Sequence, residues 1–374
     1  MGKWTLLALC FVLGLAISWF LLSRVIKMAY SHKYFDKQNS RKIHHGNIPR
    51  LGGVTFFPTM LLATFLTIFV DYMTDGPLLQ LFGDNIVKAC GVVGAGLVMY
   101  TFGLVDDMKD LRYLVKFGSQ IVAALILCFT GTYIDNLHGA LGLQELPTST
   151  GYLVTVFAFM FVVNAINFID GIDGLAASLC LLALAYFMIL FPWGTEEASS
   201  LFIVSALALS ASVVVFLCYN LGGSEARKNK IFMGDTGSTF LGMMLTVMGI
   251  AITRLQAVPQ ASLMPGANAL VLGFAPLTLP CYDVFRVVFH RIRFKKSPFA
   301  PDTNHVHHKL MHLGMSQHAT LATIIVLSIT LIFIMVLLSM VMNINLVLAV
   351  SLCVWLLFNL ALTKKIEKNQ QTTI

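Results

Sequence analysis

Charge is scarce in this sequence: Asp, Glu, Lys and Arg make up 11% of its 374 residues, whereas 57% are hydrophobic, and the mean hydropathy is +0.80. A soluble domain of this length needs a far larger charged fraction to cover its surface. The apolar residues form runs of roughly 20 residues, which is the length of helix that crosses a bilayer. The composition therefore excludes an ordinary soluble protein and predicts spanning helices, because lipid offers no partners to free backbone groups.

Three familiar signatures are also missing. The seven cysteines lie in or beside apolar runs and contain no CxxC pair, so we expect neither a disulfide framework nor a thiolate metal site. No GxxxxGK[ST] pattern occurs, which excludes a P-loop. No internal repeat or low-complexity stretch stands out, and we expect a single domain over residues 1–374.

The apolar runs predict an all-α, polytopic integral membrane protein with about eleven transmembrane helices. The first run has little positive charge before it and no small-residue cleavage site after it, so we interpret it as a retained helix. The predicted spans lie near 4–24, 51–71, 86–105, 114–134, 150–169, 174–193, 199–219, 236–254, 266–289, 320–340 and 344–363.

Lys and Arg alternate between connections in a way that predicts orientation. The connection 25–50 carries six of them, including Lys37, Arg41 and Lys42, whereas 72–85 and 135–149 carry none. The positive-inside rule therefore places the basic connections and the C-terminus in the cytoplasm and the N-terminus outside. The net charge of +7 is mostly this excess, which suits anionic lipids and substrates and requires no nucleic acid.

The first acidic cluster is GLVDDMKD, with Asp106, Asp107 and Asp110 directly after the third predicted span. Adjacent carboxylates repel each other, which raises the pKa of one of them unless a cation lies between them. A divalent metal or a nearby base such as Lys116 would relieve that repulsion. The alternative is a solvated loop with ordinary acids.

The second cluster, NAINFIDGIDG, places Asn164, Asn167, Asp170 and Asp173 at steps of three along one side of a helix end. Asn is costly inside a membrane helix and usually faces a partner or a wet cavity. The alternative is hydrogen bonding between helices followed by a tight turn.

The third cluster, FMGDTGS, contains Phe232, Asp235 and Thr236 and immediately precedes the eighth predicted span. A helix N-terminus framed by glycines offers free amides to phosphate, and a carboxylate beside it is the usual holder of Mg²⁺. The alternative is that Asp235 or Thr236 simply caps the helix.

The fourth cluster, RIRFKKSPFAPDTNHVHHKL, combines Arg291 and Arg293 with His305, His307 and His308. Arg binds phosphate bidentately. No cysteine is near, so we interpret the histidines as phosphate hydrogen-bond donors and proton carriers rather than as zinc ligands. The alternatives are membrane-surface anchoring for the basic run and a chance cluster for the histidines.

Together the clusters supply carboxylates for a divalent ion, cationic groups for phosphate and open glycine turns on one predicted face of the membrane. Phosphoryl transfer depends on such positioning and charge neutralisation more than on covalent chemistry. The position at a membrane surface favours one soluble anionic substrate and one lipid.

In this order, the motifs DDMKD, NAINFIDGIDG, FMGDTGS and HVHHKL resemble those of the polyprenyl-phosphate N-acetylhexosamine-1-phosphate transferases, over most of the chain. The stretches IPRLGG (48–53) and SPFAPDTNHVHH (297–308) are most similar to the bacterial UDP-GlcNAc:undecaprenyl-phosphate branch. The related MurNAc-pentapeptide transferases carry three consecutive histidines. Here Val306 interrupts the run, which argues against that branch.

The resemblance implies a role for each matching residue. The implied catalytic residues are Asp106, Asp107, Asp170, Asp173, His305, His307 and His308. The implied substrate-binding residues are Asn164, Asn167, Phe232, Lys116, Arg291 and Arg293, with Phe232 stacking on uracil. The implied metal ligand is Asp235.

The resemblance also implies transfer of GlcNAc-1-phosphate from UDP-GlcNAc to undecaprenyl phosphate with release of UMP, using Mg²⁺ or, alternatively, Mn²⁺. The implied setting is the bacterial inner membrane, with the bilayer as a partner, the active site facing the cytoplasm and a homodimeric assembly. Another UDP-N-acetylhexosamine remains an alternative, as does a two-step route through an aspartyl phosphate. A secondary transporter would instead predict polar residues near the midplane and paired similar halves.

Overall fold

The computed structural model describes residues 2–35, 48–191, 199–255, 264, 266–297 and 304–372, and over these residues its regular structure is entirely helical. Two isolated β-bridges, Phe35 with Pro49 and Asn136 with Glu145, are the only strand-like pairings there. The α-helices are α1 (Lys3–Ser31), α2 (Phe56–Met73), α3 (Leu78–Asp84), α4 (Ile86–Lys109), α5 (Tyr113–Phe129), α6 (Thr148–Ile169), α7 (Leu175–Leu190), α8 (Ser199–Gly222), α9 (Gly234–Leu255), α10 (Ala269–Phe274), α11 (Thr278–Arg293), α12 (Val306–His312), α13 (Gln317–Ser339) and α14 (Ile344–Thr372). The 3₁₀ turns are η1 (Gly52–Thr55), η2 (Ala140–Gly142) and η3 (Ala275–Leu277).

Within the described residues, nine helical segments are long and apolar enough to cross a membrane. Two further apolar helices, α5 and α7, have 17 and 16 residues. Each of the eleven predicted spans falls on one of these eleven segments. The chain is therefore an all-helical, multi-pass membrane protein, whereas the count of eleven crossings and the orientation of the termini remain predictions.

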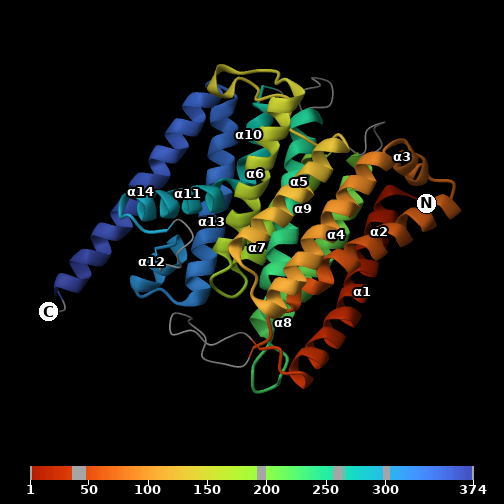
Figure 1. Cartoon of the computed structure of the whole chain (residues 1–374), viewed down its shortest axis with the longest axis horizontal. Helices are drawn as coiled ribbons and strands as arrows, with labels where there is room; N and C mark the ends of the chain where they lie inside the picture. The colour runs from red at the N-terminus through yellow and green to blue at the C-terminus, as the bar shows by residue number, and fades with distance from the viewer. Residues whose placement is uncertain are drawn as a thin grey trace.

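The ninth predicted span, 266–289, is not one continuous helix. It consists of the short α10, the turn η3 and then α11, which runs across the direction of its neighbours in Figure 1. Pro276 lies in η3 and Pro280 follows in the first turn of α11. Proline lacks the amide hydrogen that a helix interior needs, so the break falls where the prolines are.

Helix α9 lies in the middle of the bundle, where it packs against α4, α6, α7 and α10 (Figure 1). Most of its described residues are buried. Small residues allow the close packing: a Cβ on Gly242 would lie 2.8 Å from the Cα of Val163 in α6. Such small-residue contacts are the usual way that helices associate in lipid, where apolar burial gives no net gain.

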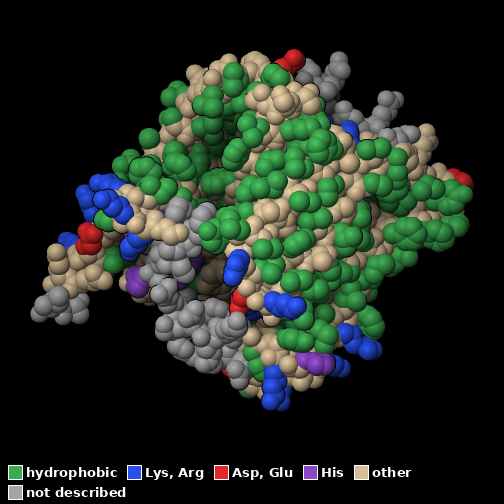
Figure 2. Space-filling model, viewed as in Figure 1, with side chains coloured by type: hydrophobic (Ala, Val, Ile, Leu, Met, Phe, Trp, Pro, Cys, Tyr) green, Lys and Arg blue, Asp and Glu red, His purple; other side chains and the backbone are tan. Residues whose placement is uncertain are grey.

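The outside of the bundle is apolar. Large side chains such as Phe65, Phe157, Phe333 and Leu357 are mostly exposed, and hydrophobic side chains cover the broad face seen in Figure 2. Charged and histidine side chains gather instead at the lower end and the left flank of that view. A surface this apolar suits lipid rather than water. The acids of the first three clusters come together at this polar end.

Candidate functional site

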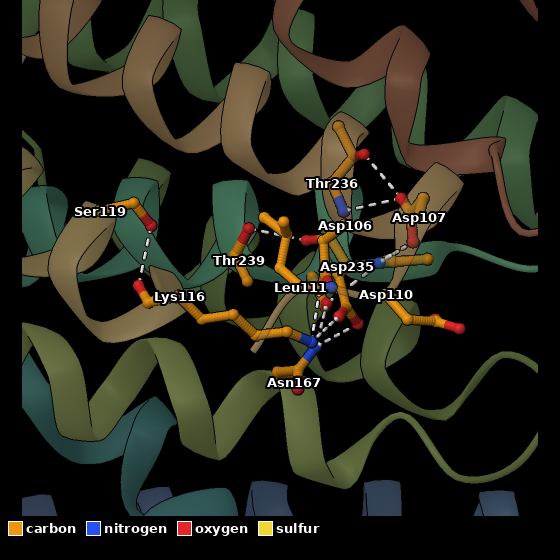
Figure 3. A network of polar contacts seen from close by, with 12 residues as sticks. Asp106, Asp107, Asp110, Leu111, Lys116, Ser119, Asn167, Asp235, Thr236 and Thr239 are labelled. Atoms are coloured by element: carbon orange, nitrogen blue, oxygen red, sulfur yellow. Dashed lines mark hydrogen bonds and ion pairs between the residues drawn. The ribbon is translucent and has the colours of Figure 1, made fainter. Parts of the chain in front are cut away.

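Two carboxylates share one ammonium in the network of polar contacts that Figure 3 shows. Asp106, at the end of α4, and Asp235, in the first turn of α9, both form ion pairs with Lys116 of α5. The Lys116 Nζ to Asp235 Oδ2 distance is 2.8 Å. Asp106 is buried, and its other oxygen accepts the Leu111 amide at 2.7 Å. Lys116 thus lies beside the acids, as the sequence predicted, but it bridges Asp106 to Asp235 rather than to Asp107.

Asn167 fixes the remaining oxygen of Asp235. Its amide nitrogen donates to Asp235 Oδ1 and to the Ser238 hydroxyl, each at 2.9 Å. One turn earlier on α6, Asn164 pairs with Gln120 of α5, donating at 2.7 Å. Asp106, Lys116, Gln120, Asn164, Asn167 and Asp235 line a common open hollow with about 380 Å³ of empty space.

Asp107 performs a different task from its neighbour. Its Oδ1 accepts the Asp235 amide at 2.7 Å, and its Oδ2 accepts the Thr236 amide at 3.0 Å and the Thr236 hydroxyl at 2.6 Å. It therefore caps the N-terminus of α9 from another helix, and points away from Lys116 in Figure 3. The alternative that Asp235 or Thr236 caps the helix is therefore wrong, and the expectation of free amides for phosphate fails at these two residues.

Close backbone contact holds this arrangement together. The IPRLGG stretch pairs with the FMG stretch: Gly52 donates to the Phe232 carbonyl at 2.9 Å and Gly53 to the Met233 carbonyl at 2.8 Å. A Cβ on Gly53 would lie 2.1 Å from the Cα of Gly237. These contacts leave no room for a side chain, which explains the paired glycines beside the site. Phe232 is partly buried there.

We expect the replacement Gly103→Ala to destabilise the protein and lower its activity. A Cβ at this position of α4 would lie 2.6 Å from the Cα of Thr236, so α9 would have to move, at a cost of about 1–3 kcal/mol. Gly118→Ala is the matched control, because it lies within α5 with no heavy atom within 4 Å of a new Cβ. Its free energy of unfolding is expected to rise by about 0.5–1 kcal/mol. Apparent melting temperature in detergent compares the two variants, and equal values would contradict the packing argument.

The end of α6 carries the second pair of acids. Burial raises the pKa of Asp170 to about 7, and neighbouring carboxylates add to the rise. Those carboxylates belong to Asp235, Asp173 and Asp107. Asp173 forms a 2.7 Å ion pair with Lys230, and both side chains are largely buried. Lys230 lies outside the four clusters of the sequence, so its pairing with a site residue is new.

The raised pKa of Asp170 predicts a pH-dependent stability. Between its ordinary value of 3.8 and about 7, the folded chain binds this proton more tightly than the unfolded chain. This carboxyl therefore lowers stability as the pH rises through that window, and lowers it no further above. Asp170→Asn is neutral at every pH. With EDTA present, the melting temperature of the variant should match that of the original protein near pH 4 and be several degrees higher at pH 8. The same difference in melting temperature at both pH values would contradict this prediction.

The histidine segment approaches the same helix end. The ring of His307 is buried and lies against Gly171, where a Cβ would be 2.2 Å from its Nε2. Neither ring nitrogen has a hydrogen-bond partner among the described residues. Burial lowers the pKa of His307 to about 3, aided by its histidine neighbours, so this ring is neutral at physiological pH. His308 packs beside it, with ring centroids 4.2 Å apart.

The arginines of that segment do not lie with the acidic residues of the hollow. Arg291 is buried at the end of α11 and Arg293 is exposed there. Neither lines the hollow around Asp106. Residues 298–303 of the SPFAPDTNHVHH stretch, and residues 36–47 of the basic connection 25–50, lie outside the described residues.

The donor set fits a hard divalent cation, although no group of three or more His, Cys, Asp or Glu side chains with metal-binding geometry occurs among the described residues. Mg²⁺ is commonly held by only one or two carboxylates together with substrate phosphates. Asp106 and Asp235 provide two such carboxylates, and one ammonium does not balance them. Asp170 adds a further carboxyl close by.

Fold and site define a multi-pass membrane protein whose carboxylates, ammonium and amides converge at one end of an apolar bundle. A family model described as glycosyl transferase family 4 matches residues 89–253. An undecaprenyl-phosphate alpha-N-acetylglucosaminyl 1-phosphate transferase of Yersinia pestis is 30% identical over 292 residues, covering 78% of this chain and 73% of that protein. A decaprenyl-phosphate N-acetylglucosaminephosphotransferase of Mycobacterium leprae (strain TN) is 32% identical over 291 residues, covering 74% and 69%.

An undecaprenyl-phosphate alpha-N-acetylglucosaminyl 1-phosphate transferase of Escherichia coli (strain K12) is 31% identical over 293 residues, covering 78% of this chain and 72% of that protein. The chain therefore belongs to glycosyl transferase family 4, and the family predicted from the motifs is confirmed.

Proposed function

We propose that this protein transfers GlcNAc-1-phosphate from UDP-GlcNAc to undecaprenyl phosphate, releasing UMP, as the first membrane step of a cell-envelope glycan pathway. The family and the reactions named for its relatives support this reaction. The observation that carries it here is the cluster of Asp106, Lys116 and Asp235 at the polar end of lipid-facing helices. Such a site can meet a soluble nucleotide and a lipid phosphate together.

We propose Mg²⁺, or Mn²⁺ in its place, as the cofactor, held by Asp235 and Asp106. The bound ion would supply positive charge to the diphosphate oxygens of the nucleotide sugar. The chain contributes the rest: Asn167 holds Asp235 in place, and the partly exposed Lys116 ammonium can bind a phosphate oxygen.

The acceptor needs little activation. A phosphate monoester has a second pKa of about 6, so undecaprenyl phosphate is largely dianionic at neutral pH. Its oxygen attacks the β-phosphorus of UDP-GlcNAc, that phosphorus–oxygen bond forms, and the bond to the UMP oxygen breaks. Asp106 orients the acceptor through Lys116 rather than acting as an obligatory base.

We further propose the bacterial inner membrane as the location, with the site facing the cytoplasm, and a homodimer as the assembly. The distribution of Lys and Arg supports the orientation. The dimer rests on the family resemblance alone.

The decisive test is UMP release by the purified protein in detergent. Release should require UDP-GlcNAc, undecaprenyl phosphate and Mg²⁺ together, stop with EDTA and be lost in Asp235→Ala. Release from UDP-GalNAc but not UDP-GlcNAc would change the sugar and keep the reaction class. If no UMP is released from any UDP-N-acetyl sugar, the proposal is wrong.

Without lipid, we expect no exchange of labelled UMP into UDP-GlcNAc. In a single displacement the nucleophile is the lipid phosphate, so no bond to UMP breaks or forms without it, whereas an aspartyl intermediate would form from protein and UDP-GlcNAc alone. The experiment incubates protein, Mg²⁺, UDP-GlcNAc and labelled UMP, and then separates the nucleotides. Label in UDP-GlcNAc would establish the two-step route instead.

A further inference from the structure

One buried carboxylate outside the sequence motifs organises the histidine segment. Asp283 lies in α11 and is completely buried. Its Oδ2 is 2.8 Å from Nδ1 of His305, and Arg286, one turn further along α11, donates to its Oδ1 at 2.9 Å. A carboxylate inside an apolar bundle is costly unless it is paired, so these contacts indicate a specific task.

The same carboxylate also anchors the backbone. The Val306 amide donates to both oxygens of Asp283, at 3.2 and 3.3 Å. Arg286 also donates to the carbonyl of Asn304. Asp283 and Arg286 thus fix the three residues at which α12 begins.

The hydrogen bonds determine which nitrogen of His305 carries the proton. Asp283 accepts hydrogen bonds from the guanidinium of Arg286 and from the amide of Val306. These are the donors expected around an ionised carboxylate, and an ionised carboxylate can only accept hydrogen bonds. His305 must therefore donate from Nδ1. When the ring is neutral, Nε2 is left with the lone pair.

The anchored ring is linked to the acid-bearing end of α6 through His307. His305 stacks on His307 with centroids 5.7 Å apart and planes 8° apart. His307 in turn lies against Gly171, which follows Asp170. Among the described residues, the charged and titratable groups recorded around His305 are Asp283 and Arg286 from α11 and the neighbouring histidines of the same segment.

We propose that Asp283 is a positioning residue for the transfer reaction: it holds His305 as the Nδ1–H tautomer and leaves Nε2 to accept a proton from the substrates. This inference rests on the proposed function. When Nε2 takes the residual proton of the lipid phosphate, an O–H bond breaks and an N–H bond forms. The Asp283 carboxylate balances the charge of the imidazolium until the proton passes to water.

Steady-state kinetics test the role. Near pH 6, where a large share of the lipid phosphate still carries its second proton, Asp283→Asn should lower kcat about a hundredfold, within the usual contribution of acid–base groups, with KM for both substrates changed less than about threefold. At about pH 8 the acceptor is dianionic and needs no base, so the loss should be much smaller. In a His305→Ala background, adding Asp283→Asn should lower kcat no further. Asp283→Glu should recover part of the rate that Asp283→Asn loses. Asp135→Asn, which removes a carboxylate paired with Arg254, is the matched control and should keep full activity.

Additive losses in the double variant, or a loss of kcat only in step with melting temperature, would overturn the inference. No turnover by the original protein would instead overturn the proposed function. The tautomer of His305 can then still be tested by ¹⁵N NMR of histidine-labelled protein. The signals lost in His305→Gln should report a proton on Nδ1 and should change in Asp283→Asn; a proton on Nε2 of neutral His305 would refute it.

Discussion

Asp106→Asn is expected to reduce turnover about a thousandfold while leaving the protein folded. The change keeps the size of the side chain and an oxygen that can still accept the Leu111 amide. It removes the negative charge of Asp106 that faces Lys116, and Asp235 remains as that ammonium's other recorded carboxylate partner. Loss of a single preorganised electrostatic group at a reacting centre typically costs about 10²–10³-fold in kcat.

The measurement is kcat for UMP release, with Mg²⁺ varied, beside melting temperature in detergent. The variant should also need more Mg²⁺ for half-maximal rate, because one of two candidate ligands is gone. Asp110→Asn is the control from the same DDMKD motif. That carboxylate pairs with Arg50 at the surface, where ion pairs contribute little. Turnover close to that of the original protein in Asp106→Asn would remove Asp106 from the site.

The apolar runs of the sequence predicted the helices well, because spanning a bilayer leaves few other structures open to them. They failed at 266–289, where hydropathy alone could not place the break. The signal was present in Pro276 and Pro280, which sit inside an otherwise apolar run. An apolar run containing two prolines predicts a bent or broken helix rather than one straight span.

The convergence of the acids was predictable for a similar reason. The motifs around Asp106, Asp170 and Asp235 all lie at predicted helix ends on one side, so folding brings them to one face. The sequence could not show that the adjacent acids Asp106 and Asp107 have different roles, one facing Lys116 and the other capping α9. Successive residues in a helix differ by about 100° in direction, and the approach of α9 decides which of the two faces it.

Asp283 was missed because it belongs to no motif. It is a single carboxylate in a predicted span, between Tyr282 and Val284. A lone acid in such a run needs a partner, and that signal could have marked it. Its partner His305 is 22 residues away along the chain, so the pairing emerges only when α11 and α12 fold together.

Asp107→Ala is expected to lower stability and turnover together, in contrast to Asp106→Asn. It removes all three hydrogen bonds that cap α9 and leaves the amides of Asp235 and Thr236 without their acceptor. Loss of a helix cap costs about 0.5–2 kcal/mol, and buried donors left unpaired add about 1–3 kcal/mol. Since Asp235 lies in that first turn, a shift of about 1 Å would lower kcat about a hundredfold.

A graded series separates capping from a direct catalytic role. Asp107→Asn keeps an oxygen acceptor and should fall between Asp107→Ala and the original protein. Thr236→Ala loses only the hydroxyl bond to Asp107 and should cost the least. If Asp107 acts through the cap, melting temperature and kcat should decline in the same order across the three variants. A hundredfold loss of kcat in Asp107→Ala with an unchanged melting temperature would show instead that the carboxylate acts on the substrates themselves, and that the α9 cap contributes little to holding Asp235 in place.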